Sequence, residues 1–149
     1  MIDIGNTALK ASWADGMTLG KTFRYQGERM MDFILSLTAK SRPELIGLSS
    51  VRTFSEQHVE RLRKECDKMI ILDSAMMEEK YAIPSYLTPD RAASVIAARY
   101  LFKGRSCTVF DFGTVFAIDF IDKDGKYEGG CISPGCHTRF RSLYRYSKS

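Results

Sequence analysis

Two short stretches of the sequence combine an aspartate, a glycine two residues later and a small polar side chain. The first is Asp3-Ile4-Gly5-Asn6-Thr7, and the second is Asp111-Phe112-Gly113-Thr114. Glycine permits a tight turn, and the N–H groups of such a turn form an anion-binding concavity to which asparagine or threonine adds a donor. The aspartate cannot bind phosphate itself, but it can hold Mg²⁺ through water, and Mg²⁺ bridges to phosphate. Each stretch therefore has the residue types of a metal and phosphate site.

Lys10 follows the first stretch within the same predicted hairpin, so its ammonium group could point back to the turn. Alone, either stretch is also typical of an ordinary β-hairpin with aspartate as a turn former, and Lys10 is typical of a solvated charge. The repetition at the start of two similar strand blocks favours the binding interpretation. The sequence contains neither GxxxxGK[ST] nor GxGxxG, so these two glycine-rich phosphate loops are excluded.

A third group is Thr88-Pro89-Asp90-Arg91, at the start of an alanine-rich run that predicts a helix. The helix dipole and the free N–H groups favour an anionic group at this end. Asp90 by itself is typical of an ordinary helix cap. Asp90 can also accept a hydroxyl proton, and Arg91 can bind a carboxylate through two hydrogen bonds. The pair therefore suits phosphorylation of an alcohol on a substrate that also carries a carboxylate.

Apolar periodicity and turn residues predict the elements that position these groups. We predict strands over 2–4, 8–14, 17–25, 44–51, 68–73, 107–113, 114–122 and 126–133, and helices over 28–39, 54–66, 90–102 and from Pro134-Gly135 through 146. Residues 75–89 are predicted to be less regular. This mixture of a β-meander with alternating strands and helices is typical of α/β architecture. Because the second strand block repeats how the first begins, we expect a duplicated module with a boundary near 103–106.

The composition is that of a globular protein. Of the 149 residues, 44% are hydrophobic and 27% are charged, and the formal net charge is +4. This mild charge permits an anionic ligand but does not argue for nucleic acid, and no apolar stretch approaches the roughly 20 residues of a membrane span. Four scattered cysteines and no visible secretory signal predict reduced thiols in a cytoplasmic protein. Cys131, Cys136 and His137 fit no common zinc pattern.

Three stretches together resemble the type III pantothenate kinases, which have an actin-like, ribonuclease-H-like phosphotransferase fold. They are IDIGNTALK at 2–10, DRAASVIAA at 90–98, and VFDFGTVFAIDFIDKDGKYEGGCISPG at 109–135. The resemblance implies a complete ribonuclease-H-like domain over 1–104 and the N-terminal part of a duplicated second domain over 105–149. It also implies ATP-dependent phosphorylation of pantothenate to 4′-phosphopantothenate, the first step of coenzyme A biosynthesis, by a cytoplasmic homodimer.

The resemblance implies a role for each residue of these motifs. Asp90 resembles the catalytic base, and Arg91 resembles the contact to the pantothenate carboxylate. Asp111 resembles the ligand of a monovalent cation, K⁺ or NH₄⁺, and Asp3 would hold Mg²⁺ through water. The other implied substrate-binding positions are Tyr86, Thr88 and Pro89, and the implied ATP-binding positions are Asp3, Gly5, Asn6, Thr7, Lys10, Gly113 and Thr114.

The chain departs from the family pattern at several places. Thr88-Pro89 stands where the family usually has Gly-x before Asp-Arg, and the loop that begins at Tyr86 is shorter. Ala117 stands where a threonine is common. Relatives also continue past the position of Ser149, so we expect a kinase trimmed at both ends, either a fragment or a degenerate copy. A half-built second domain is expected to expose apolar surface and sheet edges.

Two alternatives stay open. The chain could be a truncated or degenerate relative that binds nucleotide or acts as a regulatory protein without catalysis. The segment from Arg139 to Lys148 also interleaves basic and aromatic residues, which is one pattern of nucleic-acid binding. Its plainer interpretation is an amphipathic helix that buries Phe140, Leu143 and Tyr144 while its arginines stay solvated.

Overall fold

The computed structural model describes residues 1–147 of the chain. It divides into two compact units, Met1–Met76 and Met77–Ser149. Helix α4 (Pro89–Leu101) belongs to the second unit because it packs on strands β6 (Cys107–Phe112) and β7 (Val115–Ile121). The division into compact units therefore differs from the predicted division between residues 104 and 105.

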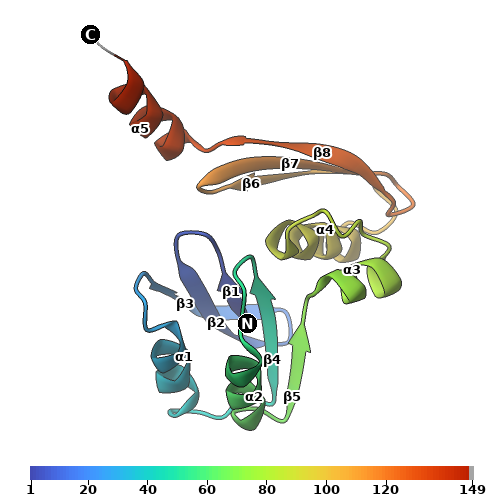
Figure 1. Ribbon diagram of the computed structural model, residues 1–149. Coiled ribbons are helices and arrows are strands. Elements are labelled where there is room, and N and C mark those ends of the chain that lie inside the picture. Colours follow the sequence, from blue (N-terminus) through green and yellow to red (C-terminus); the bar gives the residue numbers. More distant parts are fainter. Residues whose placement is uncertain (148–149) are drawn as a thin grey trace. The chain divides into compact units, whose positions relative to one another are not determined.

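The first unit is built on a five-stranded sheet in the order β3-β2-β1-β4-β5 (Figure 1). The short central strand β1 runs antiparallel to β2 and parallel to β4. Since parallel strands point the same way, the carboxyl ends of β1 and β4 meet at one edge of the sheet, where ligands commonly bind in α/β proteins. The strands are β1 (Ile2–Ile4), β2 (Leu9–Asp15), β3 (Thr18–Tyr25), β4 (Leu45–Ser50) and β5 (Lys68–Ile71).

Helices α1 (Met30–Thr38) and α2 (Glu56–Lys64) pack against this sheet. The buried residues of α1 are Met31, Ile34 and Thr38, which recur at helical spacing as the sequence predicts. The Ser55 side chain begins α2 by accepting a hydrogen bond from the backbone N–H of His58, 3.3 Å away. The core of the unit consists of almost fully buried side chains from both strands and helices, among them Ile4, Leu9, Ile34, Leu48 and Leu62.

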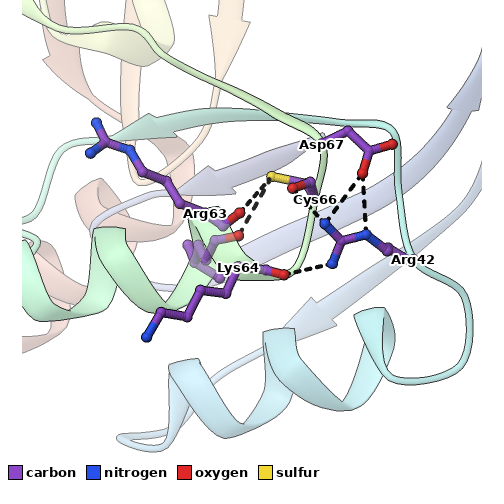
Figure 2. A network of polar contacts seen from close by, with 6 residues as sticks. Arg42, Arg63, Lys64, Cys66 and Asp67 are labelled. Atoms are coloured by element: carbon purple, nitrogen blue, oxygen red, sulfur yellow. Dashed lines mark hydrogen bonds and ion pairs between the residues drawn. The ribbon is translucent and has the colours of Figure 1, made fainter.

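The end of α2 is fixed by Arg42, which lies in the loop before β4 (Figure 2). Its guanidinium group donates to the carbonyl oxygens of Lys64 at 2.6 Å and Cys66 at 2.9 Å. Its Nε donates to Asp67 Oδ1 at 3.2 Å. The last carbonyls of a helix have no partner inside the helix, so Arg42 supplies the donors that they lack.

The second unit contains a three-stranded antiparallel sheet in the order β6-β7-β8, in which β8 spans Tyr127–Pro134. Helix α5 (Cys136–Tyr146) follows β8. Residues alternate between the two faces of the sheet. Ala117, Asp119 and Ile121 of β7 are buried on the face that α4 covers. On the opposite face, the rings of Phe110, Phe112 and Phe116 stack on one another, and Phe110 and Phe112 are exposed.

The predicted α/β class is confirmed, as are the existence and order of the predicted strands and helices. One prediction was wrong within residues 75–89, because helix α3 (Ser74–Tyr81) forms there. Met77 is its one buried residue, so the apolar periodicity that reveals a helix is absent. Asp73 still gave a local signal, since its Oδ1 accepts a hydrogen bond from the Met76 N–H at 2.8 Å.

The prediction that α5 buries Phe140, Leu143 and Tyr144 was also wrong, because all three side chains are exposed. The first turn of α5 contacts the β6–β7 turn, and the rest of the helix extends beyond the end of its sheet (Figure 1). Lys148, which belonged to the alternative nucleic-acid pattern, lies outside the described residues. No helix within residues 1–147 is long and apolar enough to cross a membrane.

Candidate active site

The first aspartate–glycine stretch lies at the end of β1 and in the loop to β2. Asp3 is directly opposite Lys10 in the antiparallel pairing, and Lys10 Nζ lies 4.0 Å from Asp3 Oδ2. The backbone N–H of Gly5 donates to the carbonyl oxygen of Ala8 at 3.0 Å and closes a four-residue loop between the strands. The structure therefore brings a carboxylate and an ammonium group together beside this turn.

Arg52 also reaches this turn, and sequence reasoning missed it. Its Nη2 donates to the carbonyl oxygen of Asn6 at 2.5 Å, and the neighbouring N–H of Val51 donates to the Ile4 carbonyl oxygen at 3.0 Å. Arg52 follows β4, whose carboxyl end lies beside that of β1. The signal that could have revealed it is therefore topological, because residues after neighbouring parallel strands meet at one sheet edge.

The second stretch forms the turn between β6 and β7. Asp111 is half-buried near the end of β6, directly opposite Ala117, and Gly113 N–H donates to the carbonyl oxygen of Val115 at 3.0 Å. Only Gly113 and Thr114 lie between these strands, whereas four residues lie between β1 and β2. The motif is thus repeated in sequence, but the two turns differ in length.

The start of α5 braces this second turn. Gly135 N–H and Thr138 Oγ1 both donate to the carbonyl oxygen of Thr114, at 3.0 and 2.7 Å. A Cβ atom on Gly135 would overlap the carbonyl oxygen of Gly113, so only glycine permits this close approach. The Pro134-Gly135 step therefore positions the helix start against the Gly113-Thr114 turn.

Asp90 lies in the first turn of α4. Thr88 is the N-cap residue and Pro89 occupies the first helical position, where its missing N–H costs nothing. Asp90 Oδ1 accepts a hydrogen bond from the Arg91 N–H at 2.9 Å, so the helix start orients the carboxylate. In the loop before the helix Leu87 is buried, whereas Tyr86 is 73% exposed and therefore accessible to a ligand.

Arg91 is paired inside the protein with Asp119. Its Nε lies 3.1 Å from Asp119 Oδ2, and its Nη2 lies 2.5 Å from Oδ1. Tyr127 donates its hydroxyl proton to Asp119 Oδ1 at 2.8 Å. The hydrogen bonding of Arg91 to Asp119 is the main cause that raises the pKa of Arg91. Burial, followed by the hydrogen bond to Asp119, raises the pKa of Tyr127 to about 12. Sequence reasoning assigned Arg91 to a substrate carboxylate and missed both of these partners.

The arrangement of the possible metal-ligating side chains limits which metal ions this part of the chain can bind. Within residues 1–147, no three His, Cys, Asp or Glu side chains gather so that they could hold a metal ion by themselves. Asp3 and Asp111 each offer a carboxylate beside a turn. Mg²⁺ fits such a position, because proteins usually hold it through one or two carboxylates together with waters and substrate phosphates.

The predicted site residues fall into two groups. Asp3 and Lys10, together with the Gly5–Thr7 turn, belong to the first compact unit. Asp90, Asp111 and the Gly113-Thr114 turn belong to the second unit. In that unit Asp111 and Asp119 share one sheet face, because Ala117 opposite Asp111 precedes Asp119 by two residues.

Comparison with known proteins places this chain in a family. The sequence model of the family described as type III pantothenate kinase matches residues 1–149. A type III pantothenate kinase from Phocaeicola vulgatus is 34% identical over 146 residues, which cover 96% of this chain and 60% of that protein. One from Bacteroides fragilis is 30% identical over 150 residues, covering 99% of this chain and 61% of the relative.

A solved structure from Campylobacter jejuni, described as a Baf family transcriptional activator, is similar with a TM-score of 0.58 at 22% identity. The similarity covers 98% of this chain and 59% of that protein, and it supports a shared fold. The chain spans about three fifths of the length of the curated relatives it matches. Its whole length matches the family model, and the chain belongs to the type III pantothenate kinase family.

Proposed function

We propose that this chain carries the ATP-binding and pantothenate-binding residues of a kinase that forms 4′-phosphopantothenate, the first step of coenzyme A biosynthesis. The observation that carries the proposal is the orientation of Asp90 at the start of α4, in a chain of this kinase family. The helix engages Oδ1, so Oδ2 is the oxygen that takes the proton from the substrate hydroxyl. Such a positioned base contributes about 10²- to 10⁴-fold to a rate.

Each aspartate–glycine turn supplies phosphate-binding groups in this proposal. In the first unit these are Gly5, Asn6, Thr7 and Lys10. In the second unit they are Gly113 and Thr114. Backbone N–H groups and the ammonium group of Lys10 supply the positive potential that developing phosphoryl charge requires.

Each carboxylate beside a turn has a separate role with a cation. Asp3 holds Mg²⁺ through water, and Asp111 holds a monovalent cation, K⁺ or NH₄⁺. Mg²⁺ supplies charge neutralisation on the phosphates when it is bound. The single carboxylates at these positions and the geometry of their turns support this assignment.

The acid substrate lies beside Tyr86, Thr88 and Pro89, with its carboxylate toward Arg91. The exposure of Tyr86 and Thr88 supports this placement. We also assign the chain to the actin-like, ribonuclease-H-like fold, with one complete module over 1–104 and the start of its duplicate over 105–149. The working state in this proposal is a homodimer, and the exposed Phe110 and Phe112 offer apolar surface for association.

A second candidate is a relative that binds nucleotide without phosphoryl transfer. The pairing of Arg91 with Asp119 favours it, because an arginine bound by an internal carboxylate has fewer donors for a substrate. This candidate keeps the ATP-binding turns and loses the acid substrate.

Pantothenate-dependent ADP release tests the proposal. The purified chain is supplied with ATP, Mg²⁺, K⁺ and pantothenate, and the Asp90→Asn and Asp124→Asn variants are measured beside it. Asp124 is exposed and pairs with its neighbour Lys123, so it controls for the loss of one negative charge. We expect turnover in the chain and in Asp124→Asn, and a loss of about 100-fold or more in Asp90→Asn. Folded chain that binds ATP but releases no ADP would favour the second candidate.

A further inference from the structure

Asp119 is a charged side chain buried in the middle strand of the second sheet, with 1% of its surface exposed. Burial of a carboxylate is costly unless the charge is paired and hydrogen-bonded. Arg91 and Tyr127 meet this requirement, because between them they contact both carboxylate oxygens. The side chain of Arg91 is itself only 14% exposed, so the pair is shielded from solvent.

Gly130 of β8 makes room for this pair. Gly130 lies directly opposite Asp119 in the β7–β8 pairing. A Cβ atom on Gly130 would overlap Asp119 Oδ1 and would lie 3.0 Å from Arg91 Nη2. It would also overlap the backbone carbonyl oxygen of Ile118, so a side chain here would force the Asp119 carboxylate out of its position beside Arg91. The glycine at position 130 thus has a physical explanation that links it to Asp119 and Arg91.

The pair also connects the start of α4 to the β6–β7 hairpin. Arg91 follows Asp90 in the first turn of the helix, and Asp119 shares a sheet face with Asp111. The hydrogen bonds to Asp119 use Nε and Nη2, so the planar guanidinium group has a fixed orientation. Nη1 is then the terminal nitrogen that remains for an external anion.

We infer that Asp119, Tyr127 and Gly130 form a clamp that orients the guanidinium group of Arg91, so that its Nη1 receives the carboxylate of the acid substrate. The inference rests on the proposed function and extends it to residues that do not touch substrate. Asp119 and Tyr127 are positioning residues, because they act through Arg91.

Kinetics with two substrates separates positioning from a merely structural role. One substrate is pantothenate, and the other is its analogue in which a hydroxymethyl group replaces the carboxylate. We expect Asp119→Asn to lower kcat/KM for pantothenate by about tenfold, with kcat/KM for the analogue and KM for ATP within about twofold. Tyr127→Phe, which keeps the packing and removes one hydrogen bond, should produce a smaller loss with the same selectivity.

Asp124→Asn serves as the matched control, since it makes the same chemical change at an exposed position of the neighbouring turn. Circular dichroism and thermal melting identify variants that fail to fold, and Tyr127→Phe decides the question if Asp119→Asn is one of them. Equal losses for pantothenate and for the analogue in a folded variant would overturn the inference.

Nitrogen-15 NMR tests the clamp even if the chain shows no turnover, an outcome that would count against the proposed function alone. We expect the Arg91 Nε–H signal, assigned by its absence in Arg91→Lys, to exchange slowly with solvent. Asp119→Asn should make this exchange fast, and Asp124→Asn should leave it slow. Exchange as fast as that of exposed arginines in the unaltered chain would contradict the clamp.

Discussion

Asp3 on β1 lies directly opposite Lys10 on β2, with the ammonium nitrogen 4.0 Å from a carboxylate oxygen. The Lys10 side chain is 60% exposed, and exposed pairs of this kind contribute about 1 kcal/mol or less to stability. The pairing therefore matters for the charge that it places beside the Gly5–Thr7 turn more than for the fold.

Lys10→Met is expected to weaken ATP binding without unfolding the protein. We expect about a tenfold rise in KM for ATP, because a charge-assisted contact to phosphate is lost, and a free energy of unfolding within about 1 kcal/mol. Steady-state kinetics and urea denaturation measure the two effects. Lys40→Met, at an exposed position of the same unit, is the matched control. An unchanged KM for ATP would remove Lys10 from the proposed phosphate site.

The phenol of Tyr127 is expected to lose its proton at a higher pH than an ordinary tyrosine. Burial and then the hydrogen bond to Asp119 raise its pKa from 10.0 to about 12. The folded chain therefore holds the phenol proton more tightly than the unfolded chain does, and this contribution to stability is complete below pH 10 and is lost as the pH rises through 12. The loss amounts to about 3 kcal/mol, since each pKa unit corresponds to about 1.4 kcal/mol.

Absorbance titration of tyrosinate checks this directly. The difference between the titration curves of the chain and of Tyr127→Phe isolates the phenol at position 127. We expect this difference to appear near pH 12, and a difference centred near pH 10 would show that the phenol is neither buried nor bound to Asp119.

Arg42→Ala is expected to destabilise the first unit more than Asp67→Asn does. Arg42 donates to the carbonyl oxygens of Lys64 and Cys66 at the end of α2. The alanine variant removes both donors and leaves these carbonyl groups without these hydrogen bonds. We expect a decrease of about 1 to 2 kcal/mol in the free energy of unfolding. Asp67→Asn should cost about 0.5 kcal/mol or less, because the ion pair is exposed. Chemical denaturation of both variants measures the difference, and equal costs would assign the role to the ion pair.

Phe112→Ser is expected to reduce self-association. Phe112 is 75% exposed on the face of the second sheet opposite α4, where it stacks on Phe116. An apolar patch of this kind drives association in water. Light scattering across a concentration series should therefore give a lower mass for the variant, while thermal melting stays the same. An unchanged mass would place any self-association on another surface.

The sequence predicted local structure well because its signals are local. Met31, Ile34 and Thr38 are buried at helical spacing, as the apolar pattern indicates, and the turns at Gly5 and Gly113 lie between the strands as predicted. Helix α3 was missed because one buried residue, Met77, gives no periodicity.

The partners of the site residues could not be predicted in the same way. Asp119 is 28 residues from Arg91, and only the packing of α4 on the second sheet brings them together. Arg52 is 46 residues from Asn6, and the parallel pairing of β1 with β4 decides their contact. The exposure of Phe140 likewise depends on where α5 leaves the sheet, which its amphipathic pattern does not encode.

Direct observation of phosphoryl transfer tests the proposed function most sharply. Phosphorus-31 NMR would follow ATP, Mg²⁺, K⁺ and pantothenate with the folded chain, with Asp90→Asn, and with pantothenate that lacks its 4′-hydroxyl group. We predict a new phosphomonoester signal with the unaltered chain, a signal that forms about 100-fold or more slowly with Asp90→Asn, and none with the deoxy substrate. No phosphomonoester from folded chain, or an undiminished rate in Asp90→Asn, would contradict the assignment of Asp90 as the base of a pantothenate kinase.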